Sequence, residues 1–348
     1  MNLYSSSFKI PVLRPTLFTR PPMYISVFNA TILIFSLLIL GGFLRWIRCL
    51  APESDKSLMS LSINVLYPCL IFDKISQTDI LSHLQSFGMA PVLGIASIVV
   101  FALILSMFIR LPSALTGLIN SDERRMFLAS SALYNYGYLP VPILMFLYPD
   151  EHEIMSCLFV FTLGVEFAVW AIIVPILAGG FHRGWWKNMI STPFVTIFLA
   201  LALNCVGGVA FIPTTVAKTI EWLGLAQLTI PLIVIGAVMF DQLRGGLVQF
   251  GALRTWQVVS WTLVFRCVVF PLLMILATRF LGGNPALQKI LVIQAAMPTA
   301  MMLVMFSRIY GGSTSVAVQS ILSTNMFSLV STVFWISFGM WGLKQPWW

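Results

Sequence analysis

Charged side chains are scarce in this sequence. Asp, Glu, Lys and Arg together make up 9% of the 348 residues, about a third of their share in soluble domains, whereas apolar residues make up 59%. A soluble domain of this length could not bury so much apolar surface, because its outside must face water. The composition therefore excludes a soluble globular protein and indicates a protein surrounded by lipid.

Residues typical of catalytic and cofactor sites are also few. The three histidines lie far apart, and no carboxylate cluster, nucleophile motif or phosphate-binding loop accompanies them. The five cysteines are scattered, without metal-ligand spacing or a paired pattern. Basic residues occur singly between apolar runs and form no patch. We therefore expect no enzyme, no cofactor, no metal site, no nucleic-acid partner and no direct drive by ATP.

What the sequence does contain is a series of long apolar runs. A helix of roughly 20 apolar residues crosses the hydrocarbon core of a bilayer. These runs predict an all-α polytopic membrane protein with ten transmembrane helices. Seven runs are long and three are shorter or interrupted: 24–44, 84–109, 126–149, 188–217, 222–240, 290–307 and 309–343, then 57–72, 154–178 and 255–278.

The distribution of basic residues predicts the orientation. With the N-terminus outside, the inner loops hold 11 Lys and Arg residues, and the outer loops and C-terminus hold 5. The positive-inside rule therefore favours both termini outside, although Lys9, Arg14 and Arg20 of the N-terminal tail narrow the difference. Residues 1–22 hold no apolar core long enough for a signal peptide. They are expected to form a disordered tail, unless translation starts at Met23.

Matching prolines indicate an internal repeat. Pro68 in the second span matches Pro231 in the seventh, and Pro142 in the fourth matches Pro298 in the ninth, each pair roughly 160 positions apart. Five spans in each half would invert the second half relative to the first, as in secondary transporters with a site at the repeat interface. The expected parts are a tail, a first repeat, an interfacial linker, a second repeat and a C-terminal tail, at 1–22, 23–180, 181–189, 190–342 and 343–348.

The fourth span carries the sharpest local signal. Pro140 and Pro142 lack an amide N–H and disturb the preceding turn, and Gly137 loosens the backbone just upstream. A broken helix at membrane depth is tolerated only inside protein or beside a water-filled cavity, and its loosened ends offer N–H groups to an anion. Asn135 can donate and accept hydrogen bonds there, and Tyr138 lies in the same stretch. The alternative is a proline kink packed against a neighbouring helix.

The ninth span offers a partner for this break. Pro298 is flanked by small residues, Gln294 lies one helical turn before it and Thr299 follows it. Alone, this pattern is typical of a common kink. Because Pro298 matches Pro142 in the other half, we predict two broken helices that meet at a substrate site.

These stretches resemble the auxin efflux carrier family. The similarity covers about 23–342 and rests on the order and spacing of several motifs, found at 135–142, 295–298, 306–310, 321–324 and 62–72. The resemblance implies a fold like that of bile acid/sodium symporters, with ten helices in an inverted repeat. Helices one, two, six and seven would form a scaffold, the others a mobile transport unit, and helices four and nine would cross at an organic-anion site.

Asn135, Pro142 and Pro298 carry over to that crossing by the resemblance, which also implies a homodimer. Pro140 departs from the family pattern as an additional proline. The long hydrophilic loop of the plant members is absent, and the short linker near 178–189 takes its place. The chain therefore resembles a compact bacterial-type member, which implies the bacterial inner membrane and leaves auxin unassigned as a substrate.

Three more polar residues lie within predicted spans. Glu166 in span five and Arg266 in span eight have similar predicted depths, which permits a buried ion pair; the alternative is ion coupling by Glu166. Asn64 lies four residues before Pro68 and so shares its helix face. It could face the substrate cavity or make a hydrogen bond between helices.

The predicted function is secondary active or facilitative transport of a small organic anion, with a carboxylate as the expected class, by alternating access. The expected substrate-binding residues are Asn135, Tyr138, Pro140, Pro142, Gln294, Pro298, Thr299 and Asn64. The alternative is a membrane-embedded ligand sensor without net transport. Because nothing in the sequence resembles a signalling domain, a sensor would act through a partner protein. Substrate identity, direction and coupling ion stay open.

Overall fold

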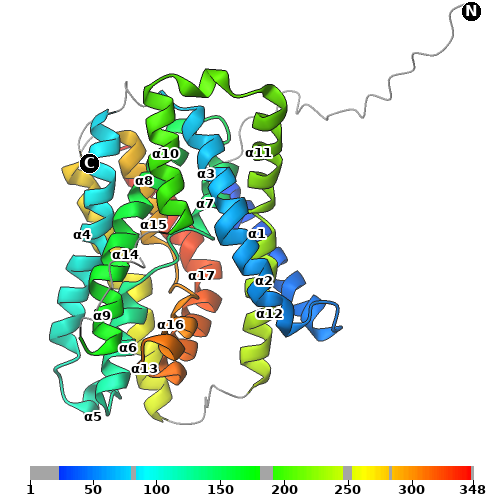
Figure 1. Cartoon of the computed structure of the whole chain (residues 1–348). Coiled ribbons are helices and arrows are strands. Elements are labelled where there is room, and N and C mark those ends of the chain that lie inside the picture. The colour runs from blue at the N-terminus through cyan, green and yellow to red at the C-terminus, as the bar shows by residue number, and fades with distance from the viewer. Residues whose placement is uncertain (1–22, 80–83, 181–190, 246–252, 282–283, 346–348) are drawn as a thin grey trace, which may run out of the picture.

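The computed structural model describes residues 23–79, 84–180, 191–245, 253–281 and 284–345. The predicted tail at 1–22 and linker at 181–189 lie outside this part of the chain. Within it, every regular element is a helix, and β pairing is limited to one isolated bridge. The helices stand side by side along one direction (Figure 1). The predicted all-α membrane class is confirmed by seven described helices that are long and apolar enough to cross a bilayer.

The first half of the chain contains four of these seven helices. Its elements are α1 Met23–Trp46; α2 Pro52–Leu61, η1 Ser62–Leu66 and α3 Tyr67–Ser76, which run on as one helix; α4 Leu84–Phe108; the short α5 Ser113–Thr116; α6 Ser121–Ala132; α7 Pro140–Leu147; and α8 His152–Ala168, η3 Val169–Ile173 and α9 Val174–Ala178, again continuous.

The second half contains the other three and one shorter apolar helix, α10. Its elements are α10 Thr192–Cys205; the 3₁₀ turn η5 Gly208–Phe211; α11 Thr214–Ala226 and α12 Ile230–Arg244; α13 Leu253–Val264, η6 Phe265–Val269, α14 Phe270–Ala277 and η7 Thr278–Phe280; α15 Pro285–Ala295; α16 Leu303–Ile309; and α17 Thr314–Gly342.

Three long helices contain a π-helical segment at the same place relative to a proline. The segments η1, η3 and η6 end two residues before Pro68, Pro175 and Pro271. Proline has no N–H to donate, and its ring would clash with the carbonyl one turn back, so the wider π turn accommodates it without ending the helix. These prolines therefore widen their helices, whereas those of the fourth and ninth spans lie where a helix stops.

Two helix pairs approach so closely that only glycine fits at the contact. On α4 and α8, a Cβ at Gly94 would overlap the carbonyl oxygen of Phe161, and one at Gly164 would overlap that of Pro91. The α1–α12 pair repeats the arrangement, with one glycine from each helix against the backbone of the other. Small residues at such crossings are how membrane helices gain van der Waals contact without a hydrophobic driving force.

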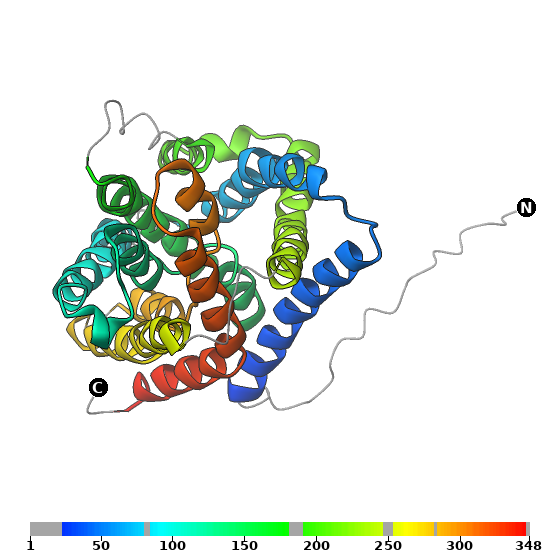
Figure 2. The same ribbon diagram turned by 90° about the horizontal axis from the view of Figure 1, so that it is seen from below.

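The helices form two groups that meet along α1 and α17 and where α3 packs on α8. In one group, α1 packs on α12, and α3 packs on α10 and α11. In the other, α4 packs on α8, while α6, α13 and α15 pack on α17. Figure 2 shows the dark-blue α1 against the orange-red α17, and α1 also contacts α7. The core of buried apolar side chains lies mostly in the second group, around the ends of α6, α7 and α15.

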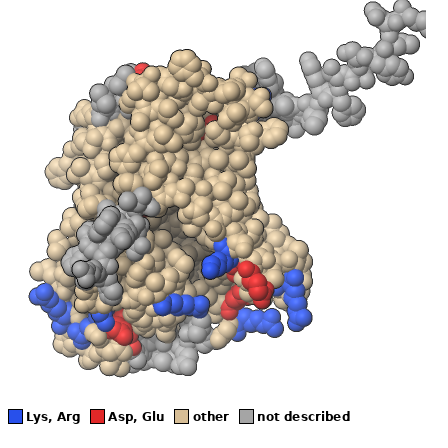
Figure 3. Space-filling model, in the orientation of Figure 1, with Lys and Arg blue, Asp and Glu red and all other residues tan. Residues whose placement is uncertain are grey.

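On one face of the molecule, charged side chains gather near the end where α1 stops, which we call the charged end. In the face shown in Figure 3 they lie almost entirely at the lower end, just below a hollow in the surface. At the end of α1, the buried Arg45 forms ion pairs with Asp55 of α2 (Nη2–Oδ2 2.5 Å) and Asp241 of α12 (Nε–Oδ2 3.0 Å). One arginine thus joins three helices of the first group at the charged end.

The close α4–α8 contact gives a test of the packing. Gly164→Ala should lower the free energy of unfolding by about 1–3 kcal/mol, because the new methyl overlaps backbone that cannot rotate away. The matched control is Gly88→Ala, also on α4, where a Cβ meets no atom within 4 Å. Both changes gain the same helix propensity, so their difference isolates the contact. Denaturation by SDS titration in mixed micelles measures it, and equal stabilities would contradict the close approach.

Candidate functional site

Two interrupted helices cross in the middle of the second group. Helix α6 ends at Ala132 and α7 begins at Pro140, while α15 ends at Ala295 and α16 begins at Leu303. Between these ends the two chain segments run antiparallel and pair at Tyr134 and Thr299. Asn135 N donates to Pro298 O (2.8 Å), and Ala300 N donates to Leu133 O (3.0 Å). Both interruptions lie in the stretches where the sequence predicts them.

The prolines of the fourth span lie at the predicted break, in the first turn of the helix that follows it. Pro140 and Pro142 do not kink a continuous helix; they occupy the first turn of α7, where an N–H would have no partner within the helix in any case. The interruption itself is the extended stretch before them. Pro298 lies in the extended segment of the ninth span, and its carbonyl oxygen is the one that Asn135 uses. All three prolines are buried.

Side chains from other helices satisfy the carbonyl groups that the breaks leave without a helical partner. Thr299 Oγ1 donates to Ser130 O at the end of α6 (2.8 Å). Thr332 Oγ1 donates to Ala296 O (3.1 Å), and Arg266 Nε donates to Met297 O (2.8 Å). An unpaired backbone group inside a membrane protein costs several kcal/mol, so these bonds are a condition for the break.

A stripe of buried hydroxyl groups on α17 faces the crossing, and the sequence analysis missed it. Ser320, Thr324, Ser328 and Thr332 recur at every fourth position and therefore share one helix face, with relative exposures of 0–4%. Thr324 Oγ1 accepts from Thr299 N (3.2 Å). The regular spacing was the available signal, since four hydroxyl residues on one face of an apolar helix indicate a polar neighbour.

Three buried amide side chains at the crossing each keep one polar atom without a hydrogen-bond partner. They are Nδ2 of Asn135, Oε1 of Gln294 and Oδ1 of Asn325. The other end of each amide is used: Asn135 Oδ1 accepts from Tyr138 N (3.1 Å), and Gln294 Nε2 donates to Tyr136 O (3.1 Å). Asn325 Nδ2 donates to Ile321 O (2.8 Å). The crossing therefore holds one donor and two acceptors that are fixed in place and can each still form a hydrogen bond with a ligand.

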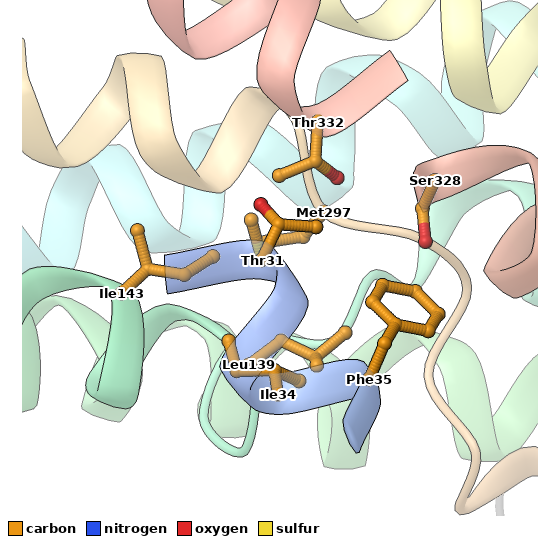
Figure 4. A pocket seen from close by; sticks show the side chains of 8 residues that line it. All are labelled: Thr31, Ile34, Phe35, Leu139, Ile143, Met297, Ser328 and Thr332. Carbon is orange, nitrogen blue, oxygen red and sulfur yellow. The ribbon is translucent and has the colours of Figure 1, made fainter. Parts of the chain in front are cut away.

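A small pocket lies between the crossing and α1 (Figure 4). Thr31, Ile34 and Phe35 of α1 form one side, and the other side comes from both interrupted helices and α17: Leu139, Ile143, Met297, Ser328 and Thr332. It has room for about one water molecule. In this conformation the pocket is therefore too small for an organic anion, and it marks the boundary between the two helix groups.

The proposed ion pair between Glu166 and Arg266 is not formed. Glu166 Oε2 accepts from Ser191 Oγ (3.3 Å), next to the start of α10, whereas Arg266 is fully buried and donates to the crossing. Similar depth in the membrane was not enough to predict an ion pair, because depth does not determine the direction in which a side chain points from its helix. Arg266 lies in the π segment η6, whereas Glu166 lies in the α-helix α8, three residues before η3.

Asn64 also lies away from the crossing. It is exposed on η1, where its Nδ2 donates to Ser60 O (3.0 Å) and its Oδ1 accepts from Thr192 Oγ1 of α10 (2.8 Å). This is the hydrogen bond between helices that the sequence analysis gave as the alternative. The structure thus brings together Asn135, Tyr138, Pro140, Pro142, Gln294, Pro298 and Thr299, and it leaves Asn64 and Glu166 outside this cluster.

No group of metal-ligating side chains accompanies the crossing in the described part of the chain, where the five cysteines are also free. The features present are apolar membrane-spanning helices, two paired breaks at their centre and unpaired polar atoms beside them. They define an integral membrane protein with a polar site inside its helix bundle, the arrangement of solute-carrying proteins.

Comparison with known proteins gives the family. Residues 26–180 and 181–336 match the family described as membrane transport protein. The chain belongs to this family, and the resemblance to auxin efflux carriers drawn from its motifs is confirmed. An uncharacterized transporter of Methanocaldococcus jannaschii is 23% identical over 88% of this chain and 97% of its own. Another, from Methanothermobacter thermautotrophicus, is 24% identical over 86% and 94%.

The bonds around Thr299 predict its contribution to stability. Thr299→Val keeps the shape of the side chain but leaves the Ser130 carbonyl without its donor, which should lower the free energy of unfolding by about 1–2 kcal/mol. Thr31→Val is the control, because the hydroxyl of Thr31 donates only to a carbonyl of its own helix and should cost less than about 0.5 kcal/mol. Equal losses in the two variants, measured by SDS titration, would contradict the role of Thr299.

Proposed function

We propose that this protein is a secondary active or facilitative transporter that moves a small organic anion, of the carboxylate class, by alternating access. The observation that carries the proposal is the free Nδ2 donor of Asn135 at the crossing. Its side chain is 3% exposed, and its Oδ1 is held by Tyr138 N, so the donor has a fixed direction before any ligand arrives. A carboxylate oxygen is the acceptor that such a donor binds most strongly.

The proposed topology is ten membrane helices in a 5+5 inverted repeat. Besides the seven long helices, α10 and the interrupted pairs α6–α7 and α15–α16 would each cross the bilayer. The equivalent positions of the two interruptions support a repeat, with boundaries at 23–180 and 190–342. So does the family match, whose two segments meet at 180 and 181. The matching positions of Pro68 and Pro231, each the second residue of its helical segment, also support the repeat.

Alternating access would come from movement of one helix group against the other. The group with α1, α3, α10 and α12 corresponds to the scaffold, and the group that holds the crossing corresponds to the transport unit. The two groups contact each other along α1 with α7 and α17 and along α3 with α8, where Ser156 Oγ donates to Lys74 O (2.9 Å). The absence of room for a substrate in the pocket beside α1 fits this proposal, because a loaded site would require the two groups to separate there.

The charged end of the molecule would face the inside of the cell. It contains the basic residues after α1, α4, α12 and α16, and the positive-inside rule then puts both termini outside. The bacterial inner membrane and a homodimer, both implied by the resemblance, belong to this proposal. The exposed large apolar side chains of α10 and α11 would contact lipid or a second copy.

Two native cysteines test the orientation. Cys49 and Cys205 are exposed and free. Cys49 follows α1 at the charged end, whereas Cys205 is the last residue of α10, at the opposite end. In intact bacterial spheroplasts, a membrane-impermeant maleimide should label Cys205 and leave Cys49 unlabelled until the cells are lysed. Variants Cys205→Ser and Cys49→Ser identify each signal. Labelling of Cys49 in intact cells would reverse the proposed orientation and leave the transport proposal standing.

The transport proposal is tested by current and tracer uptake in proteoliposomes across a panel of small mono- and dicarboxylates. Asn135→Ala should lower uptake of the best anion about 10- to 100-fold, because a hydrogen bond to a charged group contributes roughly 1.5–3 kcal/mol. Asn135→Asp separates binding from folding, since it keeps the acceptor that holds Tyr138 N but loses the donor. It should fold and still fail to transport.

Asn64→Ala is the matched control, an amide lost outside the crossing, and it should retain wild-type uptake. If Asn135→Asp retains uptake, the protein is still a transporter, but its substrate does not bind at Asn135. Binding of an anion without uptake in the wild type would favour the sensor.

A further inference from the structure

A buried cation, Arg266, lies next to the crossing and donates a hydrogen bond to it. Arg266 is 1% exposed on the π segment η6, in the middle of a long apolar helix. Its Nε donates to Met297 O (2.8 Å), but Nη1 and Nη2 have no hydrogen-bond partner. A guanidinium within a membrane is costly, and such residues usually pair or face a polar cavity. Two unpaired N–H-bearing atoms on a fully buried guanidinium therefore need an explanation.

The structure supplies no carboxylate for this charge. All 12 Asp and Glu residues lie in the described part of the chain, and none is within ion-pair distance of Arg266. Its neighbours are aromatic: the guanidinium carbon lies 3.7 Å from the centre of the Phe270 ring and 5.0 Å from that of Tyr134. Aromatic faces attract a cation but carry no net charge, so the positive charge stays unbalanced.

This charge touches both broken segments at once. Met297, which accepts from Arg266, precedes Pro298 in one segment, and Tyr134 precedes Asn135 in the other. Asn135 N donates to Pro298 O, so these two residues connect the segments. An anion held by the free amide donor of Asn135 would therefore lie in the field of the guanidinium, in an interior where little water screens it.

We infer that Arg266 is the fixed counter-charge that makes the crossing select a monocarboxylate over both neutral analogues and dicarboxylates. This rests on the proposed function and names the substrate class of that same site. The substrate's carboxylate completes the charge balance that the protein leaves open. A second carboxylate on the substrate would find no further cation, because the other basic side chains of the described chain lie at the helix ends. Arg266 acts through the field and the Met297 carbonyl and is a specificity-determining, positioning residue.

A purely structural role would be met by any donor to Met297 O, and this separates the two explanations. Arg266→Gln keeps a neutral donor and loses the charge, whereas Arg266→Lys keeps the charge and loses the planar guanidinium. If the charge matters, lysine should retain anion preference and glutamine should lose it. If only the hydrogen bond matters, glutamine should be at least as good as lysine.

The experiment compares uptake by proteoliposomes of two matched probe sets: hexanoate, hexanamide and adipate, and benzoate, benzamide and phthalate. Wild type should prefer the monocarboxylate over its amide and its dicarboxylate by about 10-fold or more in apparent affinity. Arg266→Lys should keep this preference within about 3-fold. Arg266→Gln should lose about 10-fold or more of it through KM, with amide uptake unchanged.

Each other outcome counts against the inference in a distinct way. An unchanged carboxylate-to-amide ratio in Arg266→Gln would make Arg266 structural and leave the anion transporter standing. If the wild-type protein prefers dicarboxylates, the inference that Arg266 is the only counter-charge is wrong. This result does not depend on whether the two variants fold. Wild type that takes up the amides but no carboxylate, or none of the six probes, would contradict both the inference and the proposed function.

Discussion

Every feature of this site depends on one constraint: a backbone that leaves the helix inside a membrane must find hydrogen-bond partners within the protein. The protein meets it by breaking two helices at one place and pairing the exposed segments with each other. Asn135 and Ala300 provide the two bridging N–H groups, and hydroxyl groups of Thr299 and Thr332 and the guanidinium of Arg266 cover the carbonyls that remain. The site is thus a by-product of the way the break is satisfied.

This arrangement leaves a few side-chain donors and acceptors without hydrogen-bond partners. Once the backbone is satisfied, Asn135 keeps a donor, and Gln294 and Asn325 keep acceptors. In an apolar surrounding such atoms bind a polar ligand more strongly than they would in water, since no solvent competes for them. The pocket between the crossing and α1 has room for about one water molecule, so an organic anion cannot occupy it in this conformation.

The sequence was informative where proline chemistry decides the outcome, and poor where rotation about a helix decides it. Pro140 and Pro298 mark both breaks, because a residue without an N–H constrains its own backbone wherever it lies. Glu166 and Arg266 were matched by depth, yet they have separate partners, since widened turns and side-chain direction cannot be read from position alone. The hydroxyl stripe on α17 was visible as a spacing, but only the fold shows that it faces the breaks.

The pairing of Tyr134 with Thr299 also affects how the chain is made. A ribosome delivers the fourth span long before the ninth, so Leu133 O and Asn135 N must enter the membrane before their partners exist. One further turn of α6 would pair both groups in the meantime, because Pro140 and Pro142 disturb only the carbonyls of Tyr136 and Tyr138. The paired break is therefore a late product of folding, completed only when the ninth span inserts.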